Sequence, residues 1–219
     1  MRHALFRLAV VALTAASIVG LAGPAQAALS VRALWNMDSL PTMVDSAGGD
    51  NNGSTKNLTL SGGGYLFNSK SDLATVPDKS NLDPGSASIK LTARVKFSTV
   101  PAVGGTYDIV RKGLSGTAGG DYKMEIARSS TGQAVAACTF RGNVSVVAKG
   151  SVNLATGGFQ TITCLKTASS VQVTAGGQTR TTNTAAGSIS NASSVVLGGK
   201  GDGTDAFPGV MDYVKIEIG

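Results

Sequence analysis

Histidine is almost absent from this sequence of 219 residues, since its only copy is His3. That copy lies in a segment that we expect to be removed, so the remaining chain has none. A chain without histidine has neither a Ser-His-Asp nor a Cys-His catalytic arrangement, and it cannot bind zinc through imidazole. It also has no side chain whose ordinary pKa lies near neutrality. These absences exclude most hydrolase mechanisms.

An apolar run long enough to cross a membrane, about 20 residues, is also missing. The run Leu8–Leu21 is shorter; two arginines precede it and the small-residue ending Ala25-Gln26-Ala27 follows it. This is the pattern of a Sec signal peptide over residues 1–27. We expect cleavage after Ala27 and a secreted, extracellular product. Because no lipid-carrying cysteine and no hydrophobic tail are present, we expect no membrane association.

Charge is sparse, at 15% of the residues. Loss of the two signal-peptide arginines lowers the formal net charge from +6 to about +4, and no basic run remains, so we expect no nucleic-acid binding. Lys90, Arg94 and Lys96 alternate along one segment and are interpreted as a solubilising strand face. Arg111 and Lys112 are candidates for contact with an acidic glycan.

Cysteine occurs only twice, at Cys138 and Cys164. An even number outside the cytosol favours a disulfide, whereas a reactive thiol pair would need C-x-x-C spacing or a basic neighbour. Each cysteine lies in an apolar, alternating segment. If these segments are neighbouring antiparallel strands, the bridge closes a loop of about 27 residues and stabilises the fold by roughly 3.5 kcal/mol.

Glycine is abundant, with 29 copies, and its clusters with Asn, Asp and Ser separate short alternating runs. In Ser88–Phe97 the apolar side chains occupy every second position, which predicts a strand with one buried face. About ten such strands are expected, enough for two packed antiparallel sheets. The other runs are Val31–Trp35, Gly64–Phe67, Tyr107–Arg111, Tyr122–Arg128, Ala134–Phe140, Phe159–Lys166, Val171–Thr174, Ser194–Leu197 and Val210–Ile218.

Several segments occur in an order that is typical of one family. They are Leu34–Asp38 followed by Val44–Gly48, then Asp72–Pro77, Leu82–Gly85, Ile109–Gly113 and Phe207–Ile216. Together they resemble the laminin G-like domains of the concanavalin A-like lectin and glucanase superfamily, in the form common in secreted actinobacterial proteins. The resemblance implies one all-β domain over residues 28–219, an antiparallel two-sheet jelly-roll sandwich. Phe159-Gln160 stands where many relatives have Trp-His.

The superfamily includes glycoside hydrolases, whose retaining mechanism needs two carboxylates about 5 to 5.5 Å apart. Beyond the signal peptide the only glutamates are Glu125 and Glu217. Asp121 and Glu125 share a strand face but lie roughly 13 Å apart along a straight strand, with Lys123 between them. We interpret this triplet as a solvent-facing charge ladder. Hydrolase or polysaccharide lyase activity remains an unfavoured alternative.

Calcium is the cofactor that the resemblance implies, because family members often hold a structural Ca²⁺ at the sandwich edge. The candidate ligands are Asp38 and Asp212, since Ca²⁺ prefers hard oxygen donors. Asp212 shares its alternation with Val210 and Val214, so we expect it to point to the core and to need a partner. Backbone N–H groups are the alternative partner. Asp202 and Asp205 are expected in a plain turn.

Trp35, the only tryptophan, is a possible sugar platform, but its place in an opening strand favours core packing. We therefore expect an extracellular, non-catalytic binding module for a carbohydrate ligand, where the carbohydrate part rests on the resemblance. The alternative partner is an extracellular protein, since laminin G-like domains also bind proteins. Exposed aromatic and polar groups would favour a sugar, and a large flat apolar patch would favour a protein.

Overall fold

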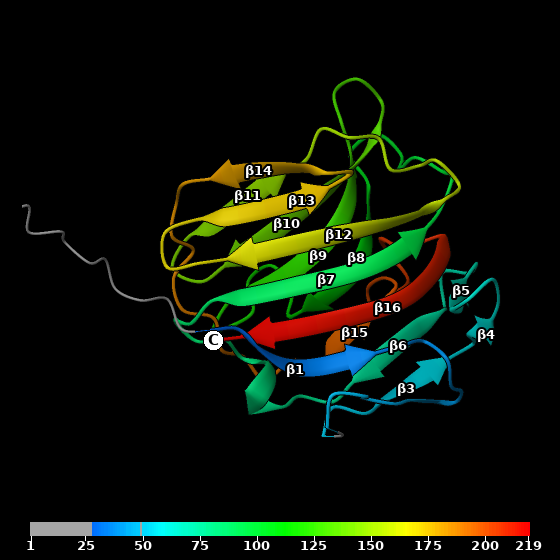
Figure 1. Ribbon diagram of the computed structural model, residues 1–219, viewed down its shortest axis with the longest axis horizontal. Coiled ribbons are helices and arrows are strands. Elements are labelled where there is room, and N and C mark those ends of the chain that lie inside the picture. The colour runs from blue at the N-terminus through cyan, green and yellow to red at the C-terminus, as the bar shows by residue number, and fades with distance from the viewer. Residues whose placement is uncertain (1–27, 49) are drawn as a thin grey trace, which may run out of the picture.

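A computed structural model describes residues 28–48 and 50–219, so the predicted signal peptide lies outside the described residues. Two sheets of eight strands each pack face to face, and every strand pairing is antiparallel (Figure 1). In the front sheet of Figure 1 the strands follow the order β14 (Gln178–Thr182), β13 (Val171–Ala175), β12 (Phe159–Lys166), β7 (Ile89–Lys96), β16 (Gly209–Ile218), β5 (Tyr65–Phe67) and β4 (Thr59–Leu60), and β1 (Ser30–Trp35) also pairs with β16.

The back sheet has the order β11 (Ser145–Lys149), β10 (Ala134–Arg141), β9 (Asp121–Arg128), β8 (Thr106–Lys112), β15 (Val195–Leu197), β6 (Leu73–Val76), β3 (Gly53–Lys56) and β2 (Thr42–Met43). The only helix among the described residues is the 3₁₀ turn η1 (Ser80–Leu82). The predicted antiparallel two-sheet sandwich is therefore confirmed. The described residues contain six strands beyond the ten expected: β2, β3, β4, β6, β11 and β14. All six are short, with two to five residues each, and β14 carries no apolar alternation.

The core fills the space between the sheets, as the strand patterns require. In β7 the alternating residues Ile89, Leu91, Ala93 and Val95 are all fully buried, while the intervening residues form the outer face. Trp35 is also fully buried, and its indole Nε1 donates to the backbone oxygen of Asn51 at 2.7 Å. Its predicted packing role is confirmed, so it is not a sugar platform.

The disulfide between Cys138 and Cys164 is present, but it joins the two sheets. Cys138 lies in β10 of the back sheet and Cys164 in β12 of the front sheet, so the condition that the two strands are neighbours in one sheet is not met. Both are fully buried, and their Cα atoms are 5.5 Å apart. Packed sheets are usually about 10 Å apart, so the sandwich narrows at this bridge.

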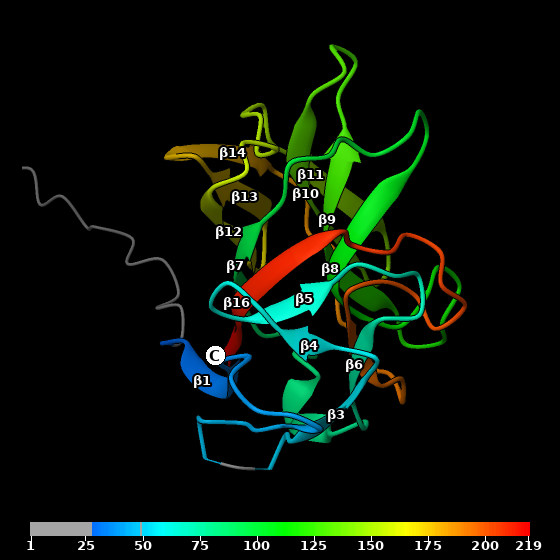
Figure 2. The ribbon, with the colours of Figure 1, turned by 90° about the vertical axis from the view of Figure 1, so that its right-hand side faces the viewer.

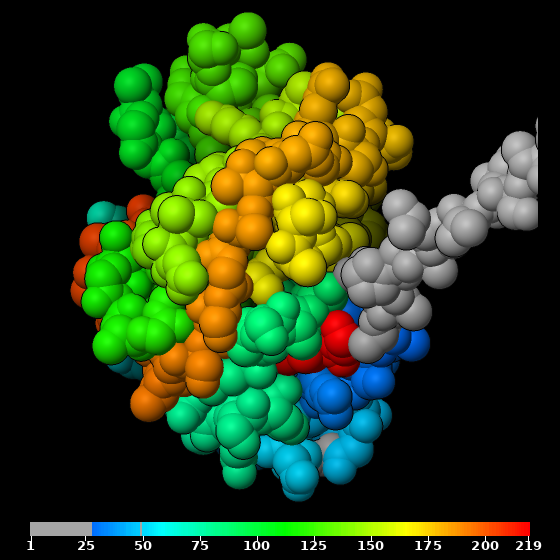
Figure 3. Space-filling model, turned by 90° about the vertical axis from the view of Figure 1, so that its left-hand side faces the viewer, coloured from blue at the N-terminus to red at the C-terminus, as the bar shows by residue number. Residues whose placement is uncertain are grey.

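The two ends of the sandwich differ. At the left-hand end the orange segment between β14 and β15 runs across the molecule (Figure 3). Along this segment Ala186 accepts a backbone hydrogen bond from Gly142, and Ile189 exchanges two with Gly85. Loops form the opposite end, which faces the viewer in Figure 2. In the part of the chain that the structure describes, no helix has the length and apolar character that a membrane crossing requires.

Candidate functional site

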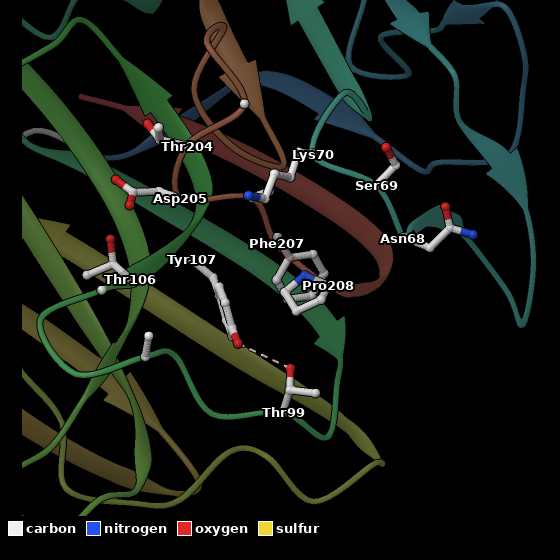
Figure 4. A pocket seen from close by; sticks show the side chains of 14 residues that line it. Asn68, Ser69, Lys70, Thr99, Thr106, Tyr107, Thr204, Asp205, Phe207 and Pro208 are labelled. Atoms are coloured by element: carbon white, nitrogen blue, oxygen red, sulfur yellow. Dashed lines mark hydrogen bonds between the residues drawn. The ribbon is translucent and has the colours of Figure 1, made fainter.

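A cavity of about 540 Å³ opens at the loop end of the sandwich (Figure 4). Its walls come from three connections, β5–β6, β7–β8 and β15–β16, and from the first residues of β8. We call it the three-loop pocket; it is lined by Asn68, Ser69, Lys70, Thr99, Ala102, Gly105, Thr106, Tyr107, Gly203, Thr204, Asp205, Ala206, Phe207 and Pro208. Because these residues come from distant parts of the sequence, only the fold brings them together.

Buried or turn-forming aspartates hold two of these loops in place. In the β5–β6 loop the carboxylate of Asp72, only 1% exposed, accepts the backbone N–H groups of Asn68 and Ser69, both at 2.8 Å. In the β15–β16 loop Asp202 Oδ1 accepts the N–H of Thr204 at 2.9 Å and its hydroxyl at 2.7 Å. This is the turn expected at Asp202. Such local bonds fix the wall before any ligand arrives.

The apolar part of the pocket is built on aromatic packing. Phe207 is 1% exposed and makes edge contacts with the rings of Phe67 and Phe97, with centroids 6.0 and 5.7 Å apart. Tyr107 is half-buried, lines the pocket, and its hydroxyl donates to Thr99 Oγ1 at 3.3 Å (Figure 4). Pro208 lies beside Phe207. The pocket therefore combines a firm apolar floor with a partly accessible ring.

Tyr107 is one of three half-buried aromatic residues among the described residues; the others are Phe159 and Tyr213. Phe159 lies on the outer face of the front sheet, where the Arg94 guanidinium stacks 4.2 Å from its ring centroid. Tyr213 lies in β16 and lines none of the five cavities described. Tyr107 is thus the aromatic side chain best placed to contact a ligand in a cavity.

Charged side chains also line the outer face of the back sheet, beside the pocket. The predicted solvent-facing ladder at Asp121, Lys123 and Glu125 is wrong in its exposure, since the two acids are only 1% and 6% exposed. Asp121 forms an ion pair with Arg141 at 2.5 Å, and Glu125 forms one with Lys123. Neighbouring side chains on this face cover one another, which the linear pattern of β9 does not reveal.

The carboxylate nearest in register to Glu125 is Asp108 of β8, and not Asp121. Asp108 is fully buried, and Arg111 Nη1 lies 2.5 Å from its Oδ2. Burial raises the pKa of Asp108 more than Arg111 lowers it, and burial likewise raises the pKa of Asp121 above its ordinary value. Because Asp108 is enclosed and ion-paired, it offers no accessible carboxylate for a substrate.

The two basic residues at the end of β8 are both buried and bound by protein partners. Arg111 is 4% exposed, and its Nε and Nη2 donate to the backbone oxygen of Gly113 at 3.0 and 2.9 Å. Lys112 is fully buried, and its Nζ lies 2.7 Å from Asp78 and 2.8 Å from Asp83. The structure gives no support to the possible contact of this pair with an acidic glycan, because protein partners occupy both side chains.

Asp38 and Asp212 do come together, lining one depression of about 500 Å³ with Asn36 and the glycine-rich turn after β4. Asp212 does not point to the core as expected. A bulge between Met211 and Tyr213 breaks the alternation of β16, and Asp212 instead forms an ion pair with Arg94.

Among residues 28–48 and 50–219 no group of three or more His, Cys, Asp or Glu side chains could hold a metal ion. Two carboxylates, one already paired with Arg94, are a short donor set for Ca²⁺, which takes 6–8 oxygen ligands. Calcium at Asp38 and Asp212 therefore stays a prediction from the sequence, and the donors that the structure describes fit it poorly.

Sequence reasoning singled out neither the pocket nor its residues Lys70 and Tyr107. The sequence pattern places Tyr107 in a strand, and Lys70 lies in a loop without a motif. The signal that existed was weak: Asn68–Asp72 contains the polar residues of a tight turn, and Gly203 lies in a glycine-rich loop. Nothing in the linear sequence indicates that the two loops meet, yet a Cβ on Gly203 would lie 3.0 Å from the Lys70 carbonyl oxygen.

Comparison with known proteins yields neighbours in structure only. The sequence matches no protein-family model and no curated protein sequence. The binding domain of Paraclostridial Mosquitocidal Protein 1 superposes with a TM-score of 0.60 at 10% identity, over 86% of this chain and 47% of that one. The Trypanosoma rangeli sialidase solved with sialic acid gives 0.60 at 16% identity, over 85% of this chain and 30% of that one.

Domain 4 of AbnA, an extracellular GH43 arabinanase from Geobacillus stearothermophilus solved with arabinotriose, gives a TM-score of 0.59 at 15% identity. This match covers 87% of this chain and 93% of that domain, whereas the chain spans less than half of the mosquitocidal binding domain and of the sialidase. At these identities the likeness shows the fold, a two-sheet β-sandwich, and leaves function to the residues of the site.

Proposed function

We propose that this protein is a secreted, non-catalytic binding module of the laminin G-like type, and that it binds a glycan in the three-loop pocket. The observation that carries the proposal is the composition of that pocket, in which the ring of Tyr107 lies among hydroxyl, amide, ammonium and carboxylate groups. Sugars present apolar C–H faces and many hydroxyl groups, so they need this mixture. The volume of about 540 Å³ is in the range of small-molecule sites.

Two further observations support a binding role. The loops are held by their own aspartates, which lowers the cost of ordering the site on binding. Structural neighbours with the same fold include an arabinanase domain solved with arabinotriose and a toxin binding domain. The non-catalytic part of the proposal rests on the enclosed, ion-paired carboxylates of the back sheet and on the lack of histidine after the signal peptide.

The test is glycan-array binding by the mature protein, residues 28–219. We expect selective binding to a subset of glycans, and we expect Tyr107→Ala to weaken it about tenfold or more, as for a residue worth at least 1.4 kcal/mol. Tyr213→Ala is the matched control, because Tyr213 is also a half-buried strand tyrosine but lies outside the pocket. If Tyr107→Ala unfolds, Tyr107→Leu replaces it in the test, because leucine retains apolar packing at this position.

Equal loss of binding in the Tyr107 and Tyr213 variants would place the ligand elsewhere. A blank array with folded protein would contradict the glycan proposal and leave the extracellular protein partner as the alternative. Release of sugar from a bound glycan during incubation would contradict the non-catalytic part.

A further inference from the structure

We propose that the ligand of the three-loop pocket is an acidic glycan, one that carries a carboxylate or sulfate group, and that Lys70 binds this group. The proposal rests on the proposed function, since it names the class of glycan that the same pocket takes. It does not depend on the identity of the sugar ring.

Lys70 is the uncompensated charge of the pocket. Its side chain is exposed, and no ion pair joins it to any acid in residues 28–48 and 50–219. The other charged residue of the lining, Asp205, is 2.6 Å from the ammonium of Lys200 outside the pocket. The nearby carboxylate of Asp72 is buried and occupied by backbone N–H groups.

The position of Lys70 is set by the fold and is not free to drift with its loop. The Asp72 bonds fix the loop on one side, and on the other side Gly203 packs against the Lys70 carbonyl, where only a glycine fits without displacing it. From this backbone the side chain extends into the pocket, between Asp205 and Phe207 (Figure 4). A flexible, hydrated ammonium held at a cavity wall is a point-charge site for an anion.

The pocket has one place for the sugar ring of such a ligand and a separate place for its acidic substituent. Tyr107 and Pro208 lie on the lower side of the pocket in Figure 4, and Lys70 lies on the upper side, with Asn68 and Ser69 beside it. A ring resting on the tyrosine can therefore direct its acidic substituent to the lysine. The formal charge of about +4 after signal-peptide loss favours approach of an anionic polymer as well.

The experiment compares acidic glycans with neutral partners that share their rings: polygalacturonate with its methyl ester, and sialyllactose with the methyl ester of its carboxylate. Affinity is measured by calorimetry at two salt concentrations, for the wild type, Lys70→Met, Lys70→Arg and the control Lys79→Met. Lys79 is an exposed lysine that directly precedes η1 and does not line the pocket, so its variant removes the same net charge elsewhere.

We expect the wild type to bind the acidic member of a pair about tenfold more tightly, as one charge-assisted hydrogen bond provides. Lys70→Met should abolish this preference, Lys70→Arg should retain it, and Lys79→Met should leave it unchanged. Equal, measurable affinity of the wild type for acidic and neutral members would overturn the proposal for Lys70 and would leave the proposed glycan binding standing. Equal weakening by Lys70→Met and Lys79→Met would show unspecific charge attraction and would also overturn it. Binding to neither member of any pair would count against both proposals.

Discussion

Replacing Cys138 and Cys164 by alanine removes the covalent link between the two sheets, and the structure sets the size of the effect. The two residues are separated by 26 positions, so reduction of the bridge releases a closed loop of moderate length in the unfolded chain. On the chain-entropy model this costs about 3.5 kcal/mol of unfolding free energy. Both sulfur atoms are fully buried in the core, so the alanines also leave a void, which adds about 1 kcal/mol.

The assay is urea unfolding of residues 28–219, followed by tryptophan fluorescence of the buried Trp35, together with calorimetric melting. For a chain of this length each 1 kcal/mol shifts the melting temperature by about 2–4 °C, so the double variant should melt roughly 9–18 °C below the wild type. Reductant should not produce the same shift at low temperature, because the fully buried bridge is accessible only after unfolding.

The single variant Cys138→Ala separates the cross-link from the packing. It already breaks the bridge, so it should carry most of the loss, and adding Cys164→Ala should change the free energy of unfolding little. If each replacement accounts for about half of the loss, packing and not the cross-link dominates. A double variant within about 1 kcal/mol of the wild type would refute the entropic reasoning altogether.

Four shorter predictions concern other parts of the structure. Lys112→Met should lower the unfolding free energy by about 3 kcal/mol in urea, because Asp83 loses its ion-pair partner in a mostly buried place and keeps only hydrogen bonds of 3.3 and 3.4 Å from Asn191 and Ser190. Gly119→Ala should cost more than about 1 kcal/mol, because this residue has a φ of +83° and a Cβ would lie 1.7 Å from a carbonyl oxygen. Burial raises the pKa of Glu217, but its two lysine partners outweigh burial and leave it lowered, so Glu217→Gln should destabilise above about pH 4.5 and lose its effect as the pH falls through the lowered pKa. If calcium binds at Asp38, Ca²⁺ should raise the melting temperature of the wild type but not of Asp38→Asn, and equal melts in Ca²⁺ and EDTA would remove the metal prediction.

The sequence was most informative where one physical demand dominates. In β7 the need to bury one face produced the alternation at Ile89, Leu91 and Ala93, and the same demand placed Trp35 in the core. The cysteine pair was predicted correctly because redox compartment and parity determine it. Whether its two strands pair side by side or face each other across the core does not follow from the pattern, because both arrangements allow the same alternation and only the sheet order distinguishes them.

Predictions from the sequence pattern were wrong where the fold brings a side chain into contact with residues that are distant in the sequence. One bulge moved Asp212 from the core to Arg94, because an inserted residue reverses the alternation for the rest of the strand. Lys112 follows Arg111 in an ordinary charged pair, yet it lies at the end of the core with two aspartates. The pocket could not be predicted from the sequence at all, because its walls come from loops that are distant in the sequence.

The distribution of satisfied charge argues for where a ligand binds. On the outer face of β8, β9 and β10 the acids Asp108, Asp121 and Glu125 each form an ion pair, so a ligand there must first break one, such as that of Asp121 with Arg141. Breaking a largely buried pair is costly, and a neutral sugar returns only ordinary hydrogen bonds. In the three-loop pocket Lys70 has no such partner among the described residues, and the ring of Tyr107 lines an open cavity. Binding there replaces water and breaks no ion pair, which is why we propose the glycan site at the loop end of the sandwich and not on the outer face of the back sheet.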